Sequence, residues 1–441
     1  MNGHDWHGRR LHFVGIGGAG MQGWATAARE LGATVTGSDL EDSPALEALR
    51  EMGIDARPGH DAANLPEGGD VEVIFSTAIP ESNPELEQAR ARGRRTMPRA
   101  ELLAELTALR RTIAVAGAHG KTSTTSMIAH ILLEAGLEPG YLIGGTLRST
   151  GRNASWGSGP WLVVEADESD RSLLAIDAEI AVLTNVELDH HATYRSIEEL
   201  REVFAEFLKG PAVVVVADDP ALVSLRAGAP CAVFDPRPVD TTAGAARFVW
   251  RGREVELGVP GEHNAWNAAA ALEVAALVGV GEDEAVAAIS TFAGAGRRFE
   301  ELGRTPKGAL VVDDYAHHPT EVAAALAAAR TRVPKRLVAV FQPHLFSRTA
   351  ELAGRFGEAL AAADLALVVD VYPSREEASD FPGVTGELVA DAARQAGGAV
   401  EWVPRMEDAR QRLAGMLGPG DLCMVLGAGD IRSLGEALVS G

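Results

Sequence analysis

Short apolar runs of strand length recur along the 441-residue chain, and two of them lead directly into glycine-rich turns. The first run covers residues 11–14 and meets Gly15 to Gly20, and the second covers 112–116 and meets Gly117 to Thr122. Further strand-like runs at 309–313, 337–341 and 365–371 alternate with Ala-rich stretches such as 322–331. Strands that alternate with helices predict parallel sheets covered on both faces, so we expect an α/β fold.

The length of the chain predicts two to four domains, at about 100–200 residues for each. We place the boundaries near residues 110 and 302, which gives domains at 1–110, 111–302 and 303–441. The first and last are expected to be Rossmann-like. The central one is expected to carry a parallel or mixed sheet of the P-loop ATPase kind, and its Gly/Ser-rich stretch at 151–160 is expected to be a loop.

Composition excludes several classes of protein. The formal net charge of −22 argues against non-specific nucleic-acid binding, which depends on a positive face. No apolar run reaches the roughly 18–20 residues of a membrane helix, and the polar first ten residues do not resemble a signal peptide. Two cysteines support neither a disulfide framework nor a cysteine-based zinc site. We therefore expect a cytoplasmic protein without a membrane or nucleic-acid partner, either a monomer or a homodimer.

The second glycine-rich turn is typical of a phosphate-binding loop. Backbone N–H groups and the start of a helix bind phosphate oxygens, while Lys121 adds a positive charge and Thr122 offers a hydroxyl to Mg²⁺. Val115 stands where the general motif has a glycine, but the strand, turn and helix context agrees with the motif. The predicted ATP-binding residues here are Gly117, Ala118, His119, Gly120, Lys121, Thr122 and Ser123.

Acidic residues follow the next apolar runs. The strand-like run that ends at Glu165 continues into Ala166-Asp167-Glu168-Ser169-Asp170, and carboxylates at a strand end suit a hard cation such as Mg²⁺. Farther on, Glu187 to His191 form a second polar cluster. Because imidazole prefers softer metals, spacing alone makes His190 a candidate for zinc binding or proton transfer.

The first glycine-rich turn has two readings. Gly15, Gly17 and Gly20, with Asp39 about 20 residues later, match a dinucleotide-binding fingerprint. Taken alone, the turn fits NAD and the diphosphate of a UDP-linked ligand about equally well.

The ordered set of motifs resembles the Mur ligase family of bacterial cell-wall enzymes over essentially the whole chain. Each segment alone is a weak signal, but their shared order is specific. The segments are HFVGIGGAGM at 12–21, GSDL at 37–40, STAIP at 76–80, the loop at 117–122, EADESD at 165–170, GEHN at 261–264 with Asn267, RRF at 297–299, DDYAHHPTE at 313–321, FQPH at 341–344 and GAGDI at 427–431.

The resemblance is strongest to the members that join L-alanine to UDP-N-acetylmuramate in peptidoglycan precursor synthesis. It implies that ATP phosphorylates the carboxylate of the nucleotide sugar and that the amine of L-alanine displaces phosphate from the acyl phosphate. Catalysis of phosphoryl transfer is largely positioning and charge stabilisation. ATP with Mg²⁺, UDP-N-acetylmuramate and L-alanine are the ligands expected on this basis.

The resemblance also assigns roles to single residues. Lys121 and Thr122 would hold the triphosphate and the first Mg²⁺, with Glu165 as a further ligand. His190 would bind a second Mg²⁺, which replaces the interpretation drawn from spacing. Asn264, Asn267, Arg298 and Asp314 would complete the ATP site: the asparagines at adenine, the arginine at the phosphates and the aspartate at the ribose.

At the first turn the resemblance favours UDP over NAD. The diphosphate would lie on the turn with help from Ser76 and Thr77. Asp39, Leu40 and His60 would line the uridine pocket, although a plain surface role for His60 remains an alternative. The expected UDP-sugar residues are Gly15, Gly17, Gly18, Ala19, Gly20, Asp39, Leu40, His60, Ser76 and Thr77.

The acceptor end is expected in the third domain. His344 is a candidate to orient the alanine amine or take its proton, and Arg348 is a candidate partner of the alanine carboxylate or the acyl phosphate. His317 is a further candidate, while His318 is equally well explained as a buried structural residue. The predicted catalytic set is thus Lys121, His190, His344 and Arg348.

Three departures from the family pattern bear on these roles. Ala192 replaces an acid near the metal-binding histidine, Leu345 replaces a common arginine, and Ala118 replaces a frequent threonine. Sister ligases hold the second metal with a carbamylated lysine. The first lysine after His190 is Lys209, for which we expect no such modification.

Three rival functions remain to be tested. A recycling ligase that attaches a preformed tripeptide to the same nucleotide sugar lacks the patterns at 343–344 and 427–430. An NAD-dependent oxidoreductase would leave Lys121 and Glu165 unexplained. A non-catalytic nucleotide-binding regulator would not need the set of Lys121, Thr122, Glu165 and His190.

Overall fold

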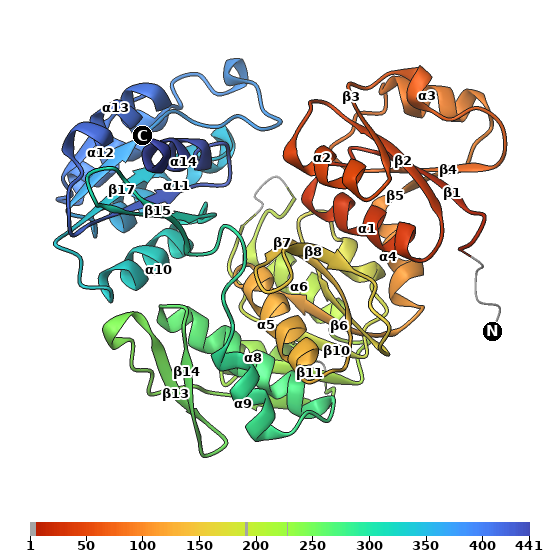
Figure 1. The fold of residues 1–441 in the computed structure, drawn as a ribbon, viewed down its shortest axis with the longest axis horizontal. Coiled ribbons are helices and arrows are strands. Elements are labelled where there is room, and N and C mark those ends of the chain that lie inside the picture. Colours follow the sequence, from red (N-terminus) through yellow and green to blue (C-terminus); the bar gives the residue numbers. More distant parts are fainter. Residues whose placement is uncertain (1–5, 190–192, 227) are drawn as a thin grey trace. The chain divides into compact units, whose positions relative to one another are not determined.

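The computed structural model describes residues 6–189, 193–226 and 228–441, with only the backbone described at Ala19. The chain packs as two compact units. One unit contains residues 1–187, 196–235 and 270–288, and the other contains 188–195, 236–269 and 289–441. Strands and helices alternate through both units (Figure 1), which confirms the predicted α/β class.

The first sheet is five-stranded and fully parallel, in the order β3-β2-β1-β4-β5. The order reverses beside β1, which creates the switch point where ligands bind to open α/β sheets. The glycine-rich turn follows β1 at this point. The strands are β1 (Arg10–Val14), β2 (Thr34–Asp39), β3 (Asp55–Pro58), β4 (Val71–Phe75) and β5 (Thr96–Pro98). The helical segments are α1 (Ala19–Glu30), α2 (Pro44–Glu51), η1 (Ala62–Asn64), α3 (Pro84–Ala91) and α4 (Arg99–Thr107).

The second sheet has seven strands in the order β12-β11-β10-β6-β9-β7-β8, and only the β7–β8 pair is antiparallel. It is therefore the mixed sheet expected from the sequence. Its strands are β6 (Arg111–Ala116), β7 (Gly140–Leu147), β8 (Arg152–Ser155), β9 (Trp161–Glu165), β10 (Ile180–Leu183), β11 (Val213–Ala217) and β12 (Cys231–Phe234). The helical segments are α5 (Lys121–Glu134), η2 (Ser172–Ala175), α6 (Ile197–Phe207) and α7 (Pro220–Leu225).

One local prediction in this region is wrong. The Gly/Ser-rich stretch at 151–160, expected to be a loop, contains strand β8. The strand pairs with β7 at the edge of the sheet, with Leu142 opposite Ala154. Long-range pairing here overrides the composition of the segment.

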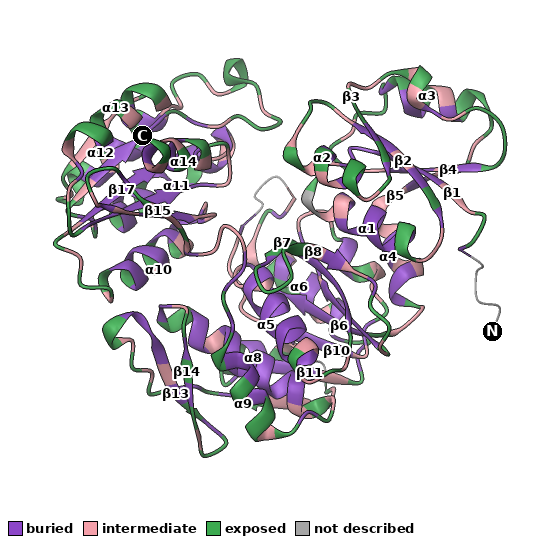
Figure 2. Cartoon of the chain, in the orientation of Figure 1, coloured by how far each residue is buried: buried purple, intermediate pink, exposed green. Residues whose placement is uncertain are grey.

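A short 3-10 helix, a hairpin and two α-helices precede the third sheet along the chain. They are η3 (Thr242–Gly244), β13 (Ala246–Trp250), β14 (Arg253–Leu257), α8 (Glu262–Leu277) and α9 (Glu282–Ser290). The α8 helix is rich in alanine and most of its residues are buried, as Figure 2 shows.

The third sheet has six strands in the order β15-β16-β20-β17-β18-β19, with an antiparallel edge at β15. Along β17, Leu337, Ala339 and Phe341 belong to one hydrophobic core, and Val338 and Val340 to another. This alternation places apolar side chains on both faces of the sheet. The strands are β15 (Glu300–Arg304), β16 (Leu310–Asp314), β17 (Arg336–Phe341), β18 (Leu365–Val368), β19 (Val400–Trp402) and β20 (Asp421–Leu426).

Helices α10 (Pro319–Arg330), α11 (Phe346–Leu360), α12 (Gly386–Gln395), α13 (Met406–Met416) and α14 (Arg432–Ser440) surround the third sheet, with η4 (Ala378–Asp380) in a loop. The α10 helix begins three residues before the predicted stretch, because His318 is its N-cap and Pro319 occupies the first turn. The proposed boundaries near residues 110 and 302 stay predictions.

Candidate functional site

The phosphate-binding loop joins the end of β6 to the start of α5. Gly117 has a φ of +131°, and a Cβ atom there would lie 2.1 Å from the Thr184 hydroxyl oxygen. Gly120 caps α5 with a φ of +82°. These two positions need glycine because an L side chain rarely adopts this backbone conformation. The loop also has an external support: the backbone N–H of His119 donates to Asn185 Oδ1 at 3.0 Å.

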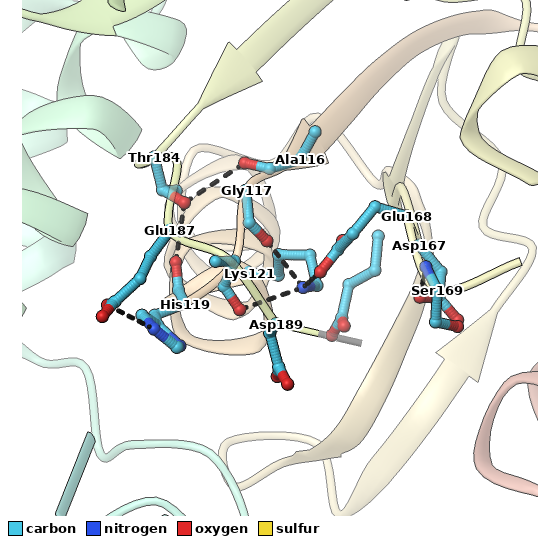
Figure 3. Close-up of polar contacts among 12 residues, drawn as sticks. Ala116, Gly117, His119, Lys121, Asp167, Glu168, Ser169, Thr184, Glu187 and Asp189 are labelled. Atoms are coloured by element: carbon cyan, nitrogen blue, oxygen red, sulfur yellow. Dashed lines mark hydrogen bonds and ion pairs between the residues drawn. The ribbon is translucent and has the colours of Figure 1, made fainter. Parts of the chain in front are cut away.

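Lys121, the first residue of α5, turns its ammonium group back onto the loop (Figure 3). Its Nζ donates to the Gly117 carbonyl at 2.6 Å and to Glu168 Oε1 at 2.9 Å. Burial would lower the pKa of Lys121, but the Glu168 and Asp167 carboxylates overcome this effect and hold the pKa above its ordinary value. The lysine is therefore a fixed positive charge at neutral pH.

Thr122 and Glu165 lie together as hard oxygen donors. The Thr122 hydroxyl is 3.3 Å from Glu165 Oε2, and the other carboxylate oxygen accepts the Gly144 N–H at 2.6 Å. Ser123 is buried in the same helical turn. A hydroxyl and a carboxylate beside a phosphate-binding loop fit Mg²⁺ coordination.

Two further carboxylates follow β9 and have opposite protonation behaviour. Burial raises the pKa of Glu168 to about 7, with the nearby Lys121 charge acting in the opposite direction. Asp167 is also buried, but Arg99 and Lys121 outweigh that burial and lower its pKa. The loop is thus surrounded by negative groups that balance its lysine.

His119 points to a different partner. Its Nε2 lies 3.0 Å from Glu187 Oε2, and its carbonyl accepts the Thr184 hydroxyl at 2.6 Å (Figure 3). His190 and Ala192 lie outside the described residues, so the assignment of His190 as a metal ligand stays a prediction.

The first glycine-rich turn lies at the carboxyl end of β1. Gly15 has a φ of +83°, and a Cβ atom there would be 3.4 Å from the Ser76 Cβ. The turns after β1 and β4 are therefore neighbours, as expected for a shared diphosphate site. The Gly17 N–H donates to Asp39 Oδ2 at 2.7 Å, and the Leu40 N–H donates to Asp39 Oδ1 at 2.8 Å.

Leu40 and His60 lie just after the ends of the adjacent strands β2 and β3. Asp39 of β2 pairs with Pro58 of β3, and the Gly59 N–H donates to the Asp39 carbonyl at 2.7 Å. The Leu40 side chain is 70% exposed, which is unusual for a large apolar residue, whereas His60 is half-buried. An exposed apolar side chain beside an imidazole is suited to contact a flat base.

Arg99 is a cation near the first turn that sequence reasoning missed. A Cβ at Gly20 would lie 3.7 Å from Arg99 Nη1, and the guanidinium pairs with Asp170 at 2.6 Å and Asp167 at 2.8 Å. Thr77 also reaches Asp170, with its hydroxyl 3.5 Å from the carboxylate. Arg99 lies in an arginine-rich stretch, so no local signal distinguishes it.

In the other unit, Asp314 and Arg298 come together at the end of β16. The Asp314 carboxylate accepts the backbone N–H groups of Phe299 and Ala316, each at 2.8 Å. Burial raises the Asp314 pKa to about 6, with Arg298 opposing the shift. The Arg298 guanidinium carbon is 4.8 Å from the centre of the Tyr315 ring.

Asn264 and Asn267 are buried near the start of α8. The Asn264 amide donates to the Pro260 carbonyl at 2.7 Å, and its oxygen accepts from Asn267 Nδ2 at 3.3 Å. These bonds fix the orientation of the Asn264 side chain, which is the predicted adenine contact.

The predicted acceptor residues cluster in the same unit. The ring of His344 stacks on Tyr372 at 5.8 Å and meets His317 edge-on at 6.2 Å. Burial, followed by the positive groups nearby, lowers the pKa of His344 to about 3, so the imidazole is neutral at pH 7. Arg348 is buried and donates from Nη2 to Asp189 Oδ1 at 2.8 Å.

Two neighbouring residues have local structural explanations. His318 is fully buried and its Nδ1 accepts the Thr320 N–H at 3.4 Å as the N-cap of α10, which supports the structural interpretation. Leu345 has a φ of +68° before α11, so the residue that replaces a common arginine is in a strained conformation.

Lys209 pairs with Glu206 on α6, and its lack of modification stays a prediction. Among the described residues, no helix is long and apolar enough to span a bilayer.

Comparison with known protein families accounts for the three large sheets. The model described as "Mur ligase family, catalytic domain" matches residues 10–111, the Mur ligase middle domain matches 115–275, and the "Mur ligase, glutamate ligase domain" matches 297–429.

The chain belongs to the Mur ligase family. This confirms the family resemblance drawn from the ordered motifs and the expected three-part α/β fold. This Mur ligase is 44% identical to a UDP-N-acetylmuramate–L-alanine ligase of Acidithiobacillus ferrooxidans, over 97% of the chain and 96% of that protein.

Two solved structures are similar in fold along the whole chain. A UDP-N-acetylmuramate–alanine ligase of Thermotoga maritima has a TM-score of 0.84 at 27% identity, covering 98% of each chain. A murein peptide ligase of Psychrobacter arcticus has a lower TM-score of 0.73 at 25% identity, also covering 98% of each chain.

Proposed function

We propose that this Mur ligase joins L-alanine to the carboxylate of UDP-N-acetylmuramate at the expense of ATP, giving UDP-N-acetylmuramoyl-L-alanine, ADP and phosphate. The observation that carries the proposal is the 44% identity, across 97% of the chain, to a relative named for this reaction. The loop at 117–122, with its lysine and neighbouring carboxylates, is consistent with ATP as the co-substrate.

The phosphate loop and its neighbours supply the charge that phosphoryl transfer requires. Phosphate oxygens would compete with the Gly117 carbonyl for the Lys121 ammonium, which already lies 2.6 Å from that carbonyl. Thr122 and Glu165 would hold Mg²⁺, which offsets negative charge on the transferred group when it is bound. The resemblance adds His190 as a ligand of a second Mg²⁺.

The family resemblance assigns further residues to ATP. Asn264 and Asn267 would contact adenine, Asp314 would accept from a ribose hydroxyl, and Arg298 would reach the phosphates. The support is that Asp314 and Arg298 already share the end of β16, next to Tyr315. The resemblance implies that the third domain closes over ATP when ATP binds.

The nucleotide sugar would occupy the first sheet. Its diphosphate would lie on the turn of Gly15, Gly17, Gly18, Ala19 and Gly20, with Ser76 and Thr77 nearby. Its uridine would be bounded by Asp39, Leu40 and His60. The carboxylate attacks the terminal phosphorus of ATP, and the resulting acyl phosphate has a better leaving group than the carboxylate itself.

His344 and Arg348 would serve the alanine end. A neutral His344 can accept a hydrogen bond from the alanine amine and so orient it, whereas a pKa of about 3 makes it a weak acceptor of the amine's proton. Arg348 would bind a carboxylate or phosphate with the guanidinium that now contacts Asp189. We place this reaction in the cytoplasm, where its product would supply peptidoglycan synthesis and thereby growth and division.

An acceptor panel tests the proposal. Purified protein with ATP, Mg²⁺ and UDP-N-acetylmuramate is assayed for ADP release with L-alanine, glycine, L-serine or a preformed cell-wall tripeptide. We expect the highest kcat/KM with L-alanine. The absence of alanine-dependent ADP release would refute the proposal, and preference for the tripeptide would identify a recycling ligase instead.

A further inference from the structure

A buried carboxylate lies beneath the loop that carries His60. Glu85, in the first turn of α3, has no exposed surface, and its two oxygens meet donors from three elements. Its partners are Ser38 Oγ at 2.7 and 2.8 Å, His12 Nε2 at 2.7 Å, the Asp61 N–H at 3.2 Å, Asn64 Nδ2 at 3.3 Å and His60 Nδ1 at 3.3 Å.

This many donors keep Glu85 ionised despite its burial. Burial alone would raise the pKa of the carboxyl group, but the hydrogen bonds from His12, His60 and Ser38 bring it down to about 2. An ionised carboxylate can only accept hydrogen bonds. The groups that face it must therefore present protons.

This requirement determines the tautomer of His60. The Ser38 hydroxyl donates its single proton to Glu85, so its oxygen can act only as an acceptor toward His60 Nδ1, 2.9 Å away. Nδ1 therefore carries a proton. In a neutral imidazole with Nδ1–H, the other nitrogen, Nε2, is a hydrogen-bond acceptor.

The same carboxylate also anchors the loop from Gly59 to Asn64. Besides its contacts with Glu85, the Asn64 amide donates to the Gly59 carbonyl at 2.8 Å. Within the described parts of the chain, His60 Nε2 has no hydrogen-bond partner, and the His60 side chain retains 14% exposure. Nε2 therefore remains able to accept a hydrogen bond from a ligand beside the exposed Leu40.

We propose that Glu85, acting through Ser38, is a positioning residue that holds His60 in the tautomer whose Nε2 accepts a hydrogen bond from the nucleoside of the substrate. The inference rests on the proposed function, which places uridine at this edge of the sheet. Two groups of uridine have the required chemistry: the N3–H of uracil and a ribose hydroxyl. Glu85 itself touches neither group.

Binding of UDP to the full-length protein, measured by calorimetry, tests the proposal without any turnover. In Glu85→Gln, a neutral amide with a single acceptor oxygen replaces the ionised carboxylate, so the acceptor that orders the protons of Ser38 and His60 is weakened. We expect the Kd for UDP to rise about tenfold, the size expected for the loss of one hydrogen bond between neutral groups. In catalysis, KM for the nucleotide sugar should rise similarly, while kcat and KM for ATP change less than about twofold.

The matched control is Glu87→Gln, an exposed carboxylate on the same helix, which should leave the UDP affinity unchanged. Ser38→Ala removes the intermediate hydroxyl while keeping Glu85, so it tests the relay even if Glu85→Gln does not fold. An unchanged UDP affinity in Ser38→Ala, or in a folded Glu85→Gln, would overturn the proposal.

A double-mutant cycle separates positioning from general damage. If Glu85 acts through His60, Glu85→Gln should have no further effect on UDP affinity in a His60→Ala background, and a full additional loss there would contradict the mechanism. Analogues identify the donor: N3-methyl-UDP lacks the base proton, and 2′-deoxy-UDP and 3′-deoxy-UDP each lack one ribose hydroxyl. One of the three should bind wild type about tenfold more weakly than UDP but bind Glu85→Gln as UDP does. If wild type binds all three analogues as tightly as UDP, the proposed acceptor role is wrong.

Discussion

Two turns of this Mur ligase have the same local form and different surroundings. Each follows a buried parallel strand, requires a glycine with positive φ and leads into a helix. The turn after β6 contains Lys121 and lies beside Thr122 and Glu165. The turn after β1 has Asp39 as its nearest polar partner, which accepts the Gly17 N–H.

The comparison shows that the backbone of a turn indicates anion binding, whereas the side chains around it indicate whether the anion reacts. A lysine, a hydroxyl and carboxylates can hold a metal and stabilise charge that moves during phosphoryl transfer. A turn without this lysine and the adjacent hydroxyl–carboxylate pair is suited to hold a diphosphate that stays intact. If the two turns have these separate roles, substitutions at one should leave the function of the other unchanged.

The largest effect is expected from Lys121→Ala. The variant should lose on the order of 10³-fold in kcat, because a fixed charge at the transferred phosphoryl group is lost. Its affinity for UDP should not change. Phosphate release and UDP calorimetry measure the two properties, and Lys209→Ala, at an exposed lysine, is the control. Equal losses in both measurements would show that the two turns do not have separate roles.

Substitution of the glycine that opens each turn should affect stability and substrate binding differently. In Gly117→Ala, the new Cβ would approach the Thr184 hydroxyl oxygen to 2.1 Å, so we expect destabilisation on the order of 3 kcal/mol and loss of ATP use. In Gly15→Ala, the nearest atom is the flexible Ile79 Cδ1 at 3.3 Å, so strain should be smaller and appear in KM for the nucleotide sugar. Unfolding midpoints and separate KM values distinguish the two outcomes.

Glu165→Gln tests the metal at the second turn. The substitution removes a negative oxygen ligand, and we expect the Mg²⁺ concentration for half-maximal rate to rise about 10- to 100-fold, a range seen even for partners behind a metal ligand. Excess Mg²⁺ should restore part of the rate. An Mg²⁺ dependence identical to that of wild type would remove Glu165 from the metal site.

The two regions should also respond to pH with opposite signs. The folded pKa of Glu85 is about 2, below its ordinary 4.5, so its stabilising contribution is present above pH 4.5 and is lost as the pH falls toward 2. The loss should be about 2 kcal/mol at pH 3, from 1.36 kcal/mol for each pH unit. Glu168, with a folded pKa of about 7, contributes stability at low pH that is lost as the pH rises from 4.5 through 7.

Unfolding midpoints of Glu85→Gln and Glu168→Gln, measured across pH 3–8, test these signs. The first variant should lose acid sensitivity, and the second should lose the decline that accompanies rising pH. The same direction of change in both variants would contradict the difference between the two sites.

Local sequence patterns were enough to place both turns and the strands that lead into them, because strand runs, glycines and helix starts are signals within a few residues. Partners from distant segments had no such signal. Asn185, which supports the phosphate loop, is 66 residues from His119, and Asp189 is 159 residues from Arg348. Glu85 and Arg99 were missed for the same reason, since only the folded sheet brings them to His60 and to the turn after β1.

The central claim concerns the two turns. The diphosphate of the nucleotide sugar stays intact at the turn after β1, while the carboxylate of the same substrate receives the phosphoryl group of ATP at the turn after β6. The most direct test uses UDP-N-acetylmuramate labelled with ¹⁸O in the carboxylate, incubated with ATP, Mg²⁺ and L-alanine. We expect each released phosphate to carry one oxygen from that carboxylate and UDP to remain attached to the product. Phosphate without the label would show that water, not the carboxylate, takes the phosphoryl group, and would contradict the account.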